Sequence, residues 1–270
     1  MMVLTLRRYL RLLRVQLRMS ATTAMQYRTE FLLKGALALF WIAVTLVPLM
    51  IVFSTTQRPT MFGWTYERSL VVLAWFTLLK AILEGGVTPS LLSVVEGVRN
   101  GSLDFVLLKP ADAQFMVSTS KFEPWRVVDF LGAAAIFVYA FQKMGRWPSG
   151  HDLVKAGVLL FVAVLLLYSI WILVVSAAFW VVRMDNLSYL FSSIFDAARW
   201  PIDAFKPPFL RWIFTYLFPL ALLTTFPAHA LLGKLDGWNT GIAVAGGVSF
   251  AVLARLVWTR AVRFYTSASS

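Results

Sequence analysis

The residues of this sequence with the best potential for proton transfer or ligand binding are pairs of opposite charges set in apolar stretches. Within each pair the residues are three or four positions apart, which places both side chains on one face of a helix: Lys80 and Glu84, Arg126 and Asp129, and Asp196 and Arg199. A charge inside a membrane span is costly, so such residues pair with one another or line a polar path such as a proton relay. We interpret all three as local ion pairs, and Asp196 and Arg199 as candidates for lining a central pathway.

Other catalytic chemistries find little support. The sequence contains no Cys, and His151 and His229 are its only histidines, which excludes thiol nucleophiles and disfavours zinc sites and Ser-His triads. The nucleotide-binding pattern G-x-x-x-x-G-K-[ST] does not occur, so the chain has no loop of this type to cradle phosphates. We therefore expect no enzymatic activity, cofactor or metal in this chain.

The composition indicates an integral membrane protein. Of 270 residues, 59% are hydrophobic and only 14% are charged, whereas soluble domains contain about 45–50% apolar and about 25% charged residues. The net charge of +12 arises from 25 Lys and Arg against 13 Asp and Glu. Because much of this basic surplus lies beside apolar segments, it fits membrane topology and anionic lipids better than nucleic acid.

Apolar stretches near the ~20 residues that a helix needs to cross a bilayer predict the spans. They lie at 31–54, 66–86, 125–142, 154–182, 186–205 and 240–258. The region from 186 to 232 is broken by prolines, which leaves open one span plus a re-entrant element, or two spans. Six spans return Arg255, Arg260 and Arg263 to the side of the basic N-terminus, as the positive-inside rule favours. We expect one all-α domain with both termini in the cytoplasm.

The segment 4–27 has the pattern of an amphipathic helix. Four arginines form one stripe along it: Arg7, Arg11, Arg14 and Arg18. Apolar residues occupy the opposite face: Leu6, Tyr9, Leu13 and Leu17. Such a helix lies in the membrane interface; a solvated basic helix on the cytoplasmic surface is the alternative.

The polar segment from about 88 to 124 has a helical pattern of its own. Gly101 predicts a break and Ser102 an N-cap, before a short helix that ends ahead of Pro110. The apolar face of that helix follows i, i+3, i+4 spacing: Leu103, Val106 and Leu107. A second short helix is predicted after Asp112. We interpret the first helix as a docking element for a cytosolic protein; the alternative is a loop helix packed on its own bundle.

This stretch resembles the R-x-G-[ST]-L-[DE]-x-x-L-L-x-P pattern in the cytoplasmic loop of type-2 ABC exporter permeases, the ABC-2 type, and in particular of uncharacterised bacterial members of similar length. The matching residues are Arg99, Gly101, Ser102, Leu103, Asp104, Leu107, Leu108 and Pro110. The resemblance implies that 98–109 is the coupling helix, seated in a cleft of a separate ABC ATPase subunit that binds ATP and magnesium, and that 4–27 is the connecting helix.

The same resemblance implies a multi-pass protein of the bacterial cytoplasmic membrane. Two permease chains, identical or related, would frame the path of a hydrophobic or amphiphilic substrate of drug, lipid or glycan type.

The proline-rich segment 206–232 is the candidate for an external gate. Broken helices at membrane depth are tolerated where protein or a wet cavity satisfies the backbone, so we expect a hairpin that enters from the outer face. The alternative is a kinked transmembrane helix. The candidate gate residues are Pro207, Phe209, Trp212, Pro219 and Pro227.

Two other functional classes compete with a permease. A membrane-embedded lipid-modifying enzyme would need a cluster of His, carboxylate or Ser side chains near one membrane face, and no group stands out at catalytic spacing. A secondary transporter would show inverted repeats with paired broken helices, and only one broken region is evident.

Overall fold

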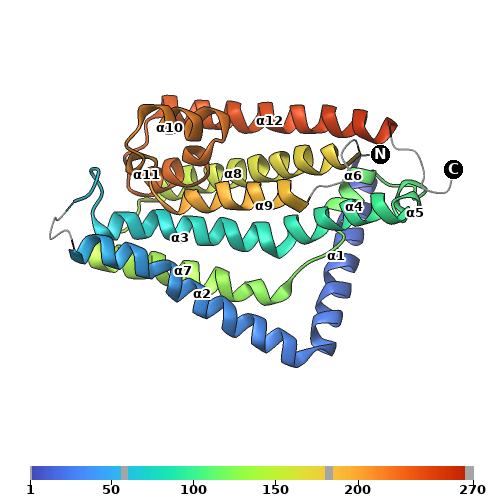
Figure 1. Ribbon diagram of the computed structural model, residues 1–270, viewed down its shortest axis with the longest axis horizontal. Coiled ribbons are helices and arrows are strands. Elements are labelled where there is room, and N and C mark those ends of the chain that lie inside the picture. Colours follow the sequence, from blue (N-terminus) through green and yellow to red (C-terminus); the bar gives the residue numbers. More distant parts are fainter. Residues whose placement is uncertain (1, 56–59, 180–184, 265–270) are drawn as a thin grey trace.

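The computed structural model describes residues 2–55, 60–179 and 185–264, and this part of the chain contains helices and no strand. Five helical stretches are long and apolar enough to cross a membrane: Arg28–Thr55, Tyr66–Val98, Pro124–Met144, Gly150–Ser176 and Gly237–Arg263. Helix α1 (Met2–Gln26) begins, and helix α12 (Gly237–Arg263) ends, at the same end of the bundle that these stretches form (Figure 1). The first and last described helices therefore have their outer ends on one side of the bundle.

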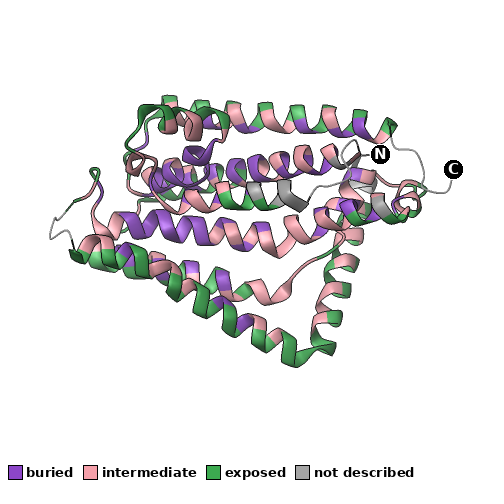
Figure 2. Ribbon diagram, viewed as in Figure 1, coloured by how far each residue is buried: buried purple, intermediate pink, exposed green. Residues whose placement is uncertain are grey.

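The first two helices meet at a sharp turn. Helix α1 lies across the end of the bundle, and α2 (Arg28–Thr55) runs back along it (Figure 1). The predicted basic stripe of α1 is exposed: Arg7, Arg11, Arg14 and Arg18. Helix α2 is little covered by the rest of the chain, because only 11% of its most apolar part is buried, and Figure 2 shows its outer side exposed. Lipid or a second chain must cover that apolar surface.

Helix α3 (Tyr66–Ile82) is the central helix. Every side chain from Ser69 to Thr77 is buried, as expected for a helix that is apolar on all sides, and Figure 2 shows this run as buried. Helix α7 (Val127–Met144) packs along α3, and α12 packs along α8 (Gly150–Ser176).

A π-helical turn, η1 (Leu83–Val87), joins α3 to α4 (Thr88–Asn100). Pro89 is the cause, because its nitrogen carries no hydrogen and its ring crowds the carbonyl four residues earlier, which belongs to Gly85. The helix widens there, and the Thr88 amide donates to the Leu83 carbonyl five residues back. The Gly85 carbonyl instead accepts a hydrogen bond from the Glu123 amide at 2.8 Å, which fastens the segment before α7 to this turn.

The segment 206–232 forms a bent pair of helical stretches. Helix α10 (Pro208–Trp212) continues into a π turn at Ile213–Leu217, and a second π turn at Ala221–Thr225 continues into α11 (Phe226–Leu231). The two halves meet at 73°, a geometry shared by a broken span and a re-entrant hairpin. Each π turn ends two residues before a proline, Pro219 or Pro227, as η1 does before Pro89.

The structure divides the stretch 186–205, over which the sequence predicts one span. Helix α9 covers Asp185–Asp196, and 3-10 turns follow at Ala197–Arg199 and Ile202–Ala204. The 12 residues of α9 advance about 18 Å, which is short of the ~30 Å hydrocarbon core, and Pro201 interrupts the helix beyond them. Helix α9 still leads the chain toward the end of the bundle that holds α10 and α11 (Figure 1). Residues 180–182, the end of the predicted span 154–182, lie outside the described residues.

Candidate functional site

The loop between α4 and α7 forms an apolar tip at the end of the bundle. Helix α4 ends at Gly101, whose φ of +75° is a left-handed conformation that glycine adopts readily. Leu103 is buried, with 2% of its surface exposed, and anchors the four-residue helix α5 (Asp104–Leu107). Phe105 and Leu108 project away from the protein, with 71% and 81% of their surface exposed. We call these two residues the apolar tip.

The predicted coupling helix 98–109 is therefore not continuous. Its first residues belong to α4, and the backbone breaks at Gly101 before α5 begins. Ser102 does not act as the predicted N-cap, because Leu103 occupies that position and no side chain caps α5. The backbone of Arg99 lies in α4, but its side chain is outside the described part of the structure. The remaining pattern residues are partly or fully exposed around the tip: Ser102, Asp104, Leu107 and Pro110.

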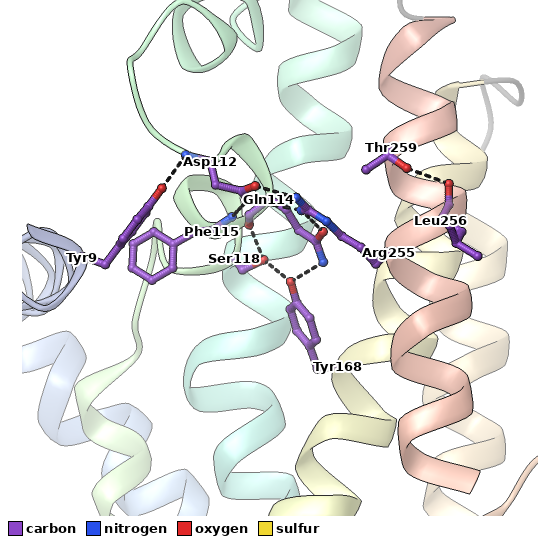
Figure 3. A network of polar contacts seen from close by, with 9 residues as sticks. All are labelled: Tyr9, Asp112, Gln114, Phe115, Ser118, Tyr168, Arg255, Leu256 and Thr259. Carbon is purple, nitrogen blue, oxygen red and sulfur yellow. Dashed lines mark hydrogen bonds and ion pairs between the residues drawn. The ribbon is translucent and has the colours of Figure 1, made fainter. Parts of the chain in front are cut away.

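A polar network holds the base of the tip against α1 (Figure 3). The predicted second short helix is confirmed as α6 (Ala113–Ser118), and Asp112 caps it by accepting a hydrogen bond from the Phe115 amide at 2.9 Å. The Asp112 amide donates to the Tyr9 hydroxyl of α1 at 3.0 Å. The rings of Tyr9 and Phe115 meet edge to face at 4.7 Å. The connection between interfacial helix and tip is thus both polar and aromatic.

Arg255 ties the same network to α12 (Figure 3). Its guanidinium donates to the two carboxylate oxygens of Asp112, at 2.7 and 3.4 Å, and to Gln114 Oε1 at 2.6 Å. Gln114 Nε2 donates to the Tyr168 hydroxyl of α8 at 2.9 Å, and Ser118 Oγ lies 2.8 Å from the same hydroxyl. The network therefore joins the tip to α1, α8 and α12.

The electrostatics of Asp112 follow from this geometry. Partial burial raises the pKa of its carboxyl, but hydrogen bonds from Arg255 and the Phe115 amide outweigh that effect and hold the pKa below its usual value. Asp112 is therefore ionised at neutral pH, as an ion pair with Arg255 requires.

The charged pairs predicted from the sequence are present, and two of them merge. Lys80 Nζ lies 3.7 Å from Glu84 and Arg126 Nη1 lies 2.9 Å from Asp129. Arg126 also pairs with Glu84, so it links the π turn to the start of α7.

The candidate pathway residues Asp196 and Arg199 form a third pair at 3.2 Å. They lie on α9 and the turn after it, and Asp196 lines a cavity together with Lys80 and Glu84 of the α3 side. The structure thus places all three pairs near the same π turn.

The segment 206–232 is fastened to the bundle by polar contacts. The Trp64 ring lies 4.8 Å from that of His229, and Trp64 Nε1 donates to Asp203, in the turn that precedes the segment, at 3.0 Å. The Thr224 hydroxyl donates to the Ala198 carbonyl at 2.8 Å. These bonds satisfy backbone and side-chain groups that lipid would leave unpaired.

The candidate gate residues fall on two sides of this segment. Pro219 and Pro227 are buried, and each follows one of the two π turns described above. Pro207, Phe209 and Trp212 are exposed, the latter two by 68% and 58%. Within one chain these aromatic side chains therefore line no closed passage, and they are free to contact a second chain or lipid.

Sequence reasoning missed several residues that the structure brings together. Phe105 belongs to the tip, and its signal was the i, i+3 spacing to the exposed Leu108. Gln114 and Tyr168 had a weaker signal, since Tyr168 carries a hydroxyl inside an uncharged span. Among the described residues, no group of three or more His, Asp and Glu side chains lies close enough to hold a metal ion.

Comparison with known proteins identifies the family. A family model described as "ABC-2 family transporter protein" matches residues 39–269, most of the chain. Neither the curated proteins nor the solved structures contain a match. The matched region includes the tip loop, the charged pairs and the bent segment 206–232. With its helical bundle of membrane-spanning length, the chain belongs to the ABC-2 family of transporter proteins.

Proposed function

We propose that this chain is the permease subunit of an ATP-driven exporter and that a separate cytosolic ABC ATPase docks on the apolar tip. Membership of a transporter family and the lack of a G-x-x-x-x-G-K-[ST] sequence support this division of labour. In this proposal the tip, α1 and both chain ends face the cytoplasm of a bacterium, and the segment 206–232 forms the gate at the outer face.

The contrast between Leu103 and its neighbours is the observation that carries the proposal. A four-residue helix cannot be stable alone in water, yet α5 is anchored by one buried leucine. Phe105 and Leu108 bury little apolar surface within the fold, because both side chains face outward. Exposed apolar side chains held on a fixed support are typical of the anchors that fill a pocket in a partner protein.

The network beneath the tip supports force transmission. Movement of the ATPase displaces the tip, and hydrogen bonds at Asp112 and Gln114 connect the tip to α1, α8 and α12. A flexible loop without these bonds would move by itself and would leave the spans in place. The tied loop passes it to the spans that border the transport path.

A second permease chain completes the proposed path. The poorly covered α2 and the exposed Phe209 and Trp212 supply apolar surface for it. The paired charges of the α3–α9 region suit a substrate that combines an apolar body with a polar group.

The test is co-purification of the ATPase with the full chain in detergent. The double variant Phe105→Ala/Leu108→Ala is expected to lose the ATPase while keeping its thermal unfolding temperature, because neither side chain is buried. Trp238→Ala is the matched control, since Trp238 is 76% exposed and lies at the start of α12, the opposite end of the bundle. Full retention of the ATPase by the double variant would show that the tip is not the docking site.

A further inference from the structure

A cavity of about 350 Å³ lies between the π turn η1, the segment before α7, and α9. Positive and negative side chains are equally represented in its lining: Lys34, Lys80 and Arg126 against Glu84, Glu123 and Asp196. A cavity for a purely anionic or cationic group would carry an excess of the opposite charge. Balanced charge suits a ligand that carries both signs.

The two charges best placed to bind such a ligand come from two different helices. Lys80, on α3, is 37% exposed and its ammonium lies 3.7 Å from Glu84, longer than the 2.7–2.9 Å typical of a charge-assisted hydrogen bond. Asp196, on α9, is 44% exposed, and its ion pair with Arg199, at 3.2 Å, is likewise longer than that range. Arg126, by contrast, is 18% exposed and engaged by both Glu84 and Asp129, so it supports the wall.

Two polar atoms beside this cavity lack a partner. Thr88 Oγ1 and Arg126 Nε are buried and make no hydrogen bond to any described residue, although both residues belong to the lining. Buried polar groups are nearly always paired. Small rotations of these side chains toward the cavity would offer them to an oxygen of a bound ligand.

The rest of the lining is apolar. Leu83, Leu92 and Phe195 contribute hydrocarbon surface, and Trp125 lies at the start of the third candidate span, where tryptophan marks the level of lipid headgroups. The cavity thus sits where the polar head of an amphiphile would meet its chain.

We propose that this cavity binds the zwitterionic headgroup of the transported amphiphile, with its phosphate at Lys80 and its ammonium at Asp196. The assignment rests on the proposed permease function and names the substrate class for it. No covalent step is involved, and selection arises because each end of the headgroup meets a side chain of the opposite charge.

The absence of cysteine from the natural sequence makes a direct test possible. Ser192 and its neighbour Ser193 are both exposed, but only Ser192 lines the cavity. In the purified full chain, lysophosphatidylethanolamine is expected to slow maleimide modification of Ser192→Cys and to leave Ser193→Cys unaffected. Lysophosphatidylglycerol and monoacylglycerol of equal chain length are expected to protect at least about tenfold more weakly. The first forfeits the ammonium contact, and the second forfeits both charge-assisted contacts.

Lys80→Gln and Asp196→Asn, each added to Ser192→Cys, are expected to raise the half-protecting concentration about tenfold. Lys143→Gln, outside the cavity, should not. Equal protection by all three lipids, or protection of Ser193→Cys, overturns the site. The comparison of the three lipids needs only the Ser192→Cys chain, so it remains valid even if a charge variant fails to fold.

A second arm separates a substrate from a resident lipid. In the assembled complex, lysophosphatidylethanolamine is expected to stimulate ATP hydrolysis, and Lys80→Gln is expected to abolish the stimulation. Protection without stimulation overturns the substrate assignment and identifies a structural lipid. Failure of any ATPase to associate overturns the proposed function instead, while the protection experiment on the isolated chain still reports on the cavity.

Discussion

The ion pair between Asp112 and Arg255 decides whether the tip is tied to the last span. Asp112→Asn removes the charge but keeps an oxygen able to cap α6, because Asn and Asp are equally good N-caps. Arg255→Gln removes the guanidinium. Combined in a double-mutant cycle, the two changes isolate the interaction from the cap.

The size of the interaction follows from its geometry and exposure. The Arg255 and Asp112 side chains are 50% and 36% exposed, so solvent screens the pair, and exposed pairs contribute about 0.2–1 kcal/mol. The contacts to both carboxylate oxygens, at 2.7 and 3.4 Å, and the shared bond to Gln114 place this pair near the upper end. We expect a coupling free energy of about 1 kcal/mol.

The assay is chemical unfolding of each single and double variant in detergent micelles. Arg260→Gln is the matched control, because Arg260 is an exposed arginine of the same helix, and its coupling to Asp112→Asn is expected to be near zero. Free-energy changes for Asp112→Asn and Arg255→Gln that add within about 0.3 kcal/mol would refute the reasoning.

The dependence of this coupling on pH has a definite sign. The folded pKa of Asp112 lies below the ordinary 3.8, so its contribution is fully present above that value and is lost as the pH falls through the lower folded pKa. The coupling measured at pH 5.5 and at pH 8 should therefore agree. A coupling that is lost between those pH values would contradict the depressed pKa.

Three further predictions follow from single residues. Pro89→Ala restores a backbone N–H that competes for the Gly85 carbonyl, so hydrogen exchange at the Glu123 amide should accelerate; unchanged exchange would exclude proline as the cause of the π turn. Gly247→Ala places a Cβ 2.7 Å from a Val162 methyl and should lower the free energy of unfolding by about 1–3 kcal/mol. Gly241→Ala, whose Cβ would meet no atom within 4 Å, should not destabilise the protein. Equal effects of the two variants would refute the close α8–α12 contact. A cysteine at exposed Ser102 should react with an impermeant thiol reagent only after cells are permeabilised, and labelling of intact cells would invert the proposed topology.

The helices were largely predictable because their cause is local. A bilayer demands about 20 apolar residues in sequence, so long stretches such as that of α8 are legible without a structure. The same holds for the charged pairs, since i, i+3 and i, i+4 spacing fixes which side chains meet on one helix. Leu103 also signalled its burial through the helical spacing of its apolar neighbours.

The connections between distant segments were not predictable. Nothing in the sequence near Asp112 indicates that Arg255 is its partner, because the two residues meet only through the packing of α12 against α8. A break at Gly101 was predicted, yet the predicted coupling helix 98–109 extended across it. The chain reverses there because the Leu103 amide donates to the Gly97 carbonyl at 3.1 Å, a contact that the sequence does not reveal.

The stretch 186–205 shows why apolar composition alone does not predict a span. Its composition is apolar enough for a span, but Pro201 interrupts the helix where a span would continue. A π turn ends two residues before each of Pro89, Pro219 and Pro227, which indicates that a single cause, a missing amide hydrogen, shapes all three π turns.

The most direct test of docking at the tip is site-specific photo-crosslinking in native membranes. A photoreactive amino acid at Leu108 of the full chain is expected to yield a covalent adduct with an ABC ATPase, identified by mass spectrometry. The same amino acid at Trp238 is expected to yield none with that protein. Adducts at Leu108 that contain only lipid or the permease itself would contradict the account.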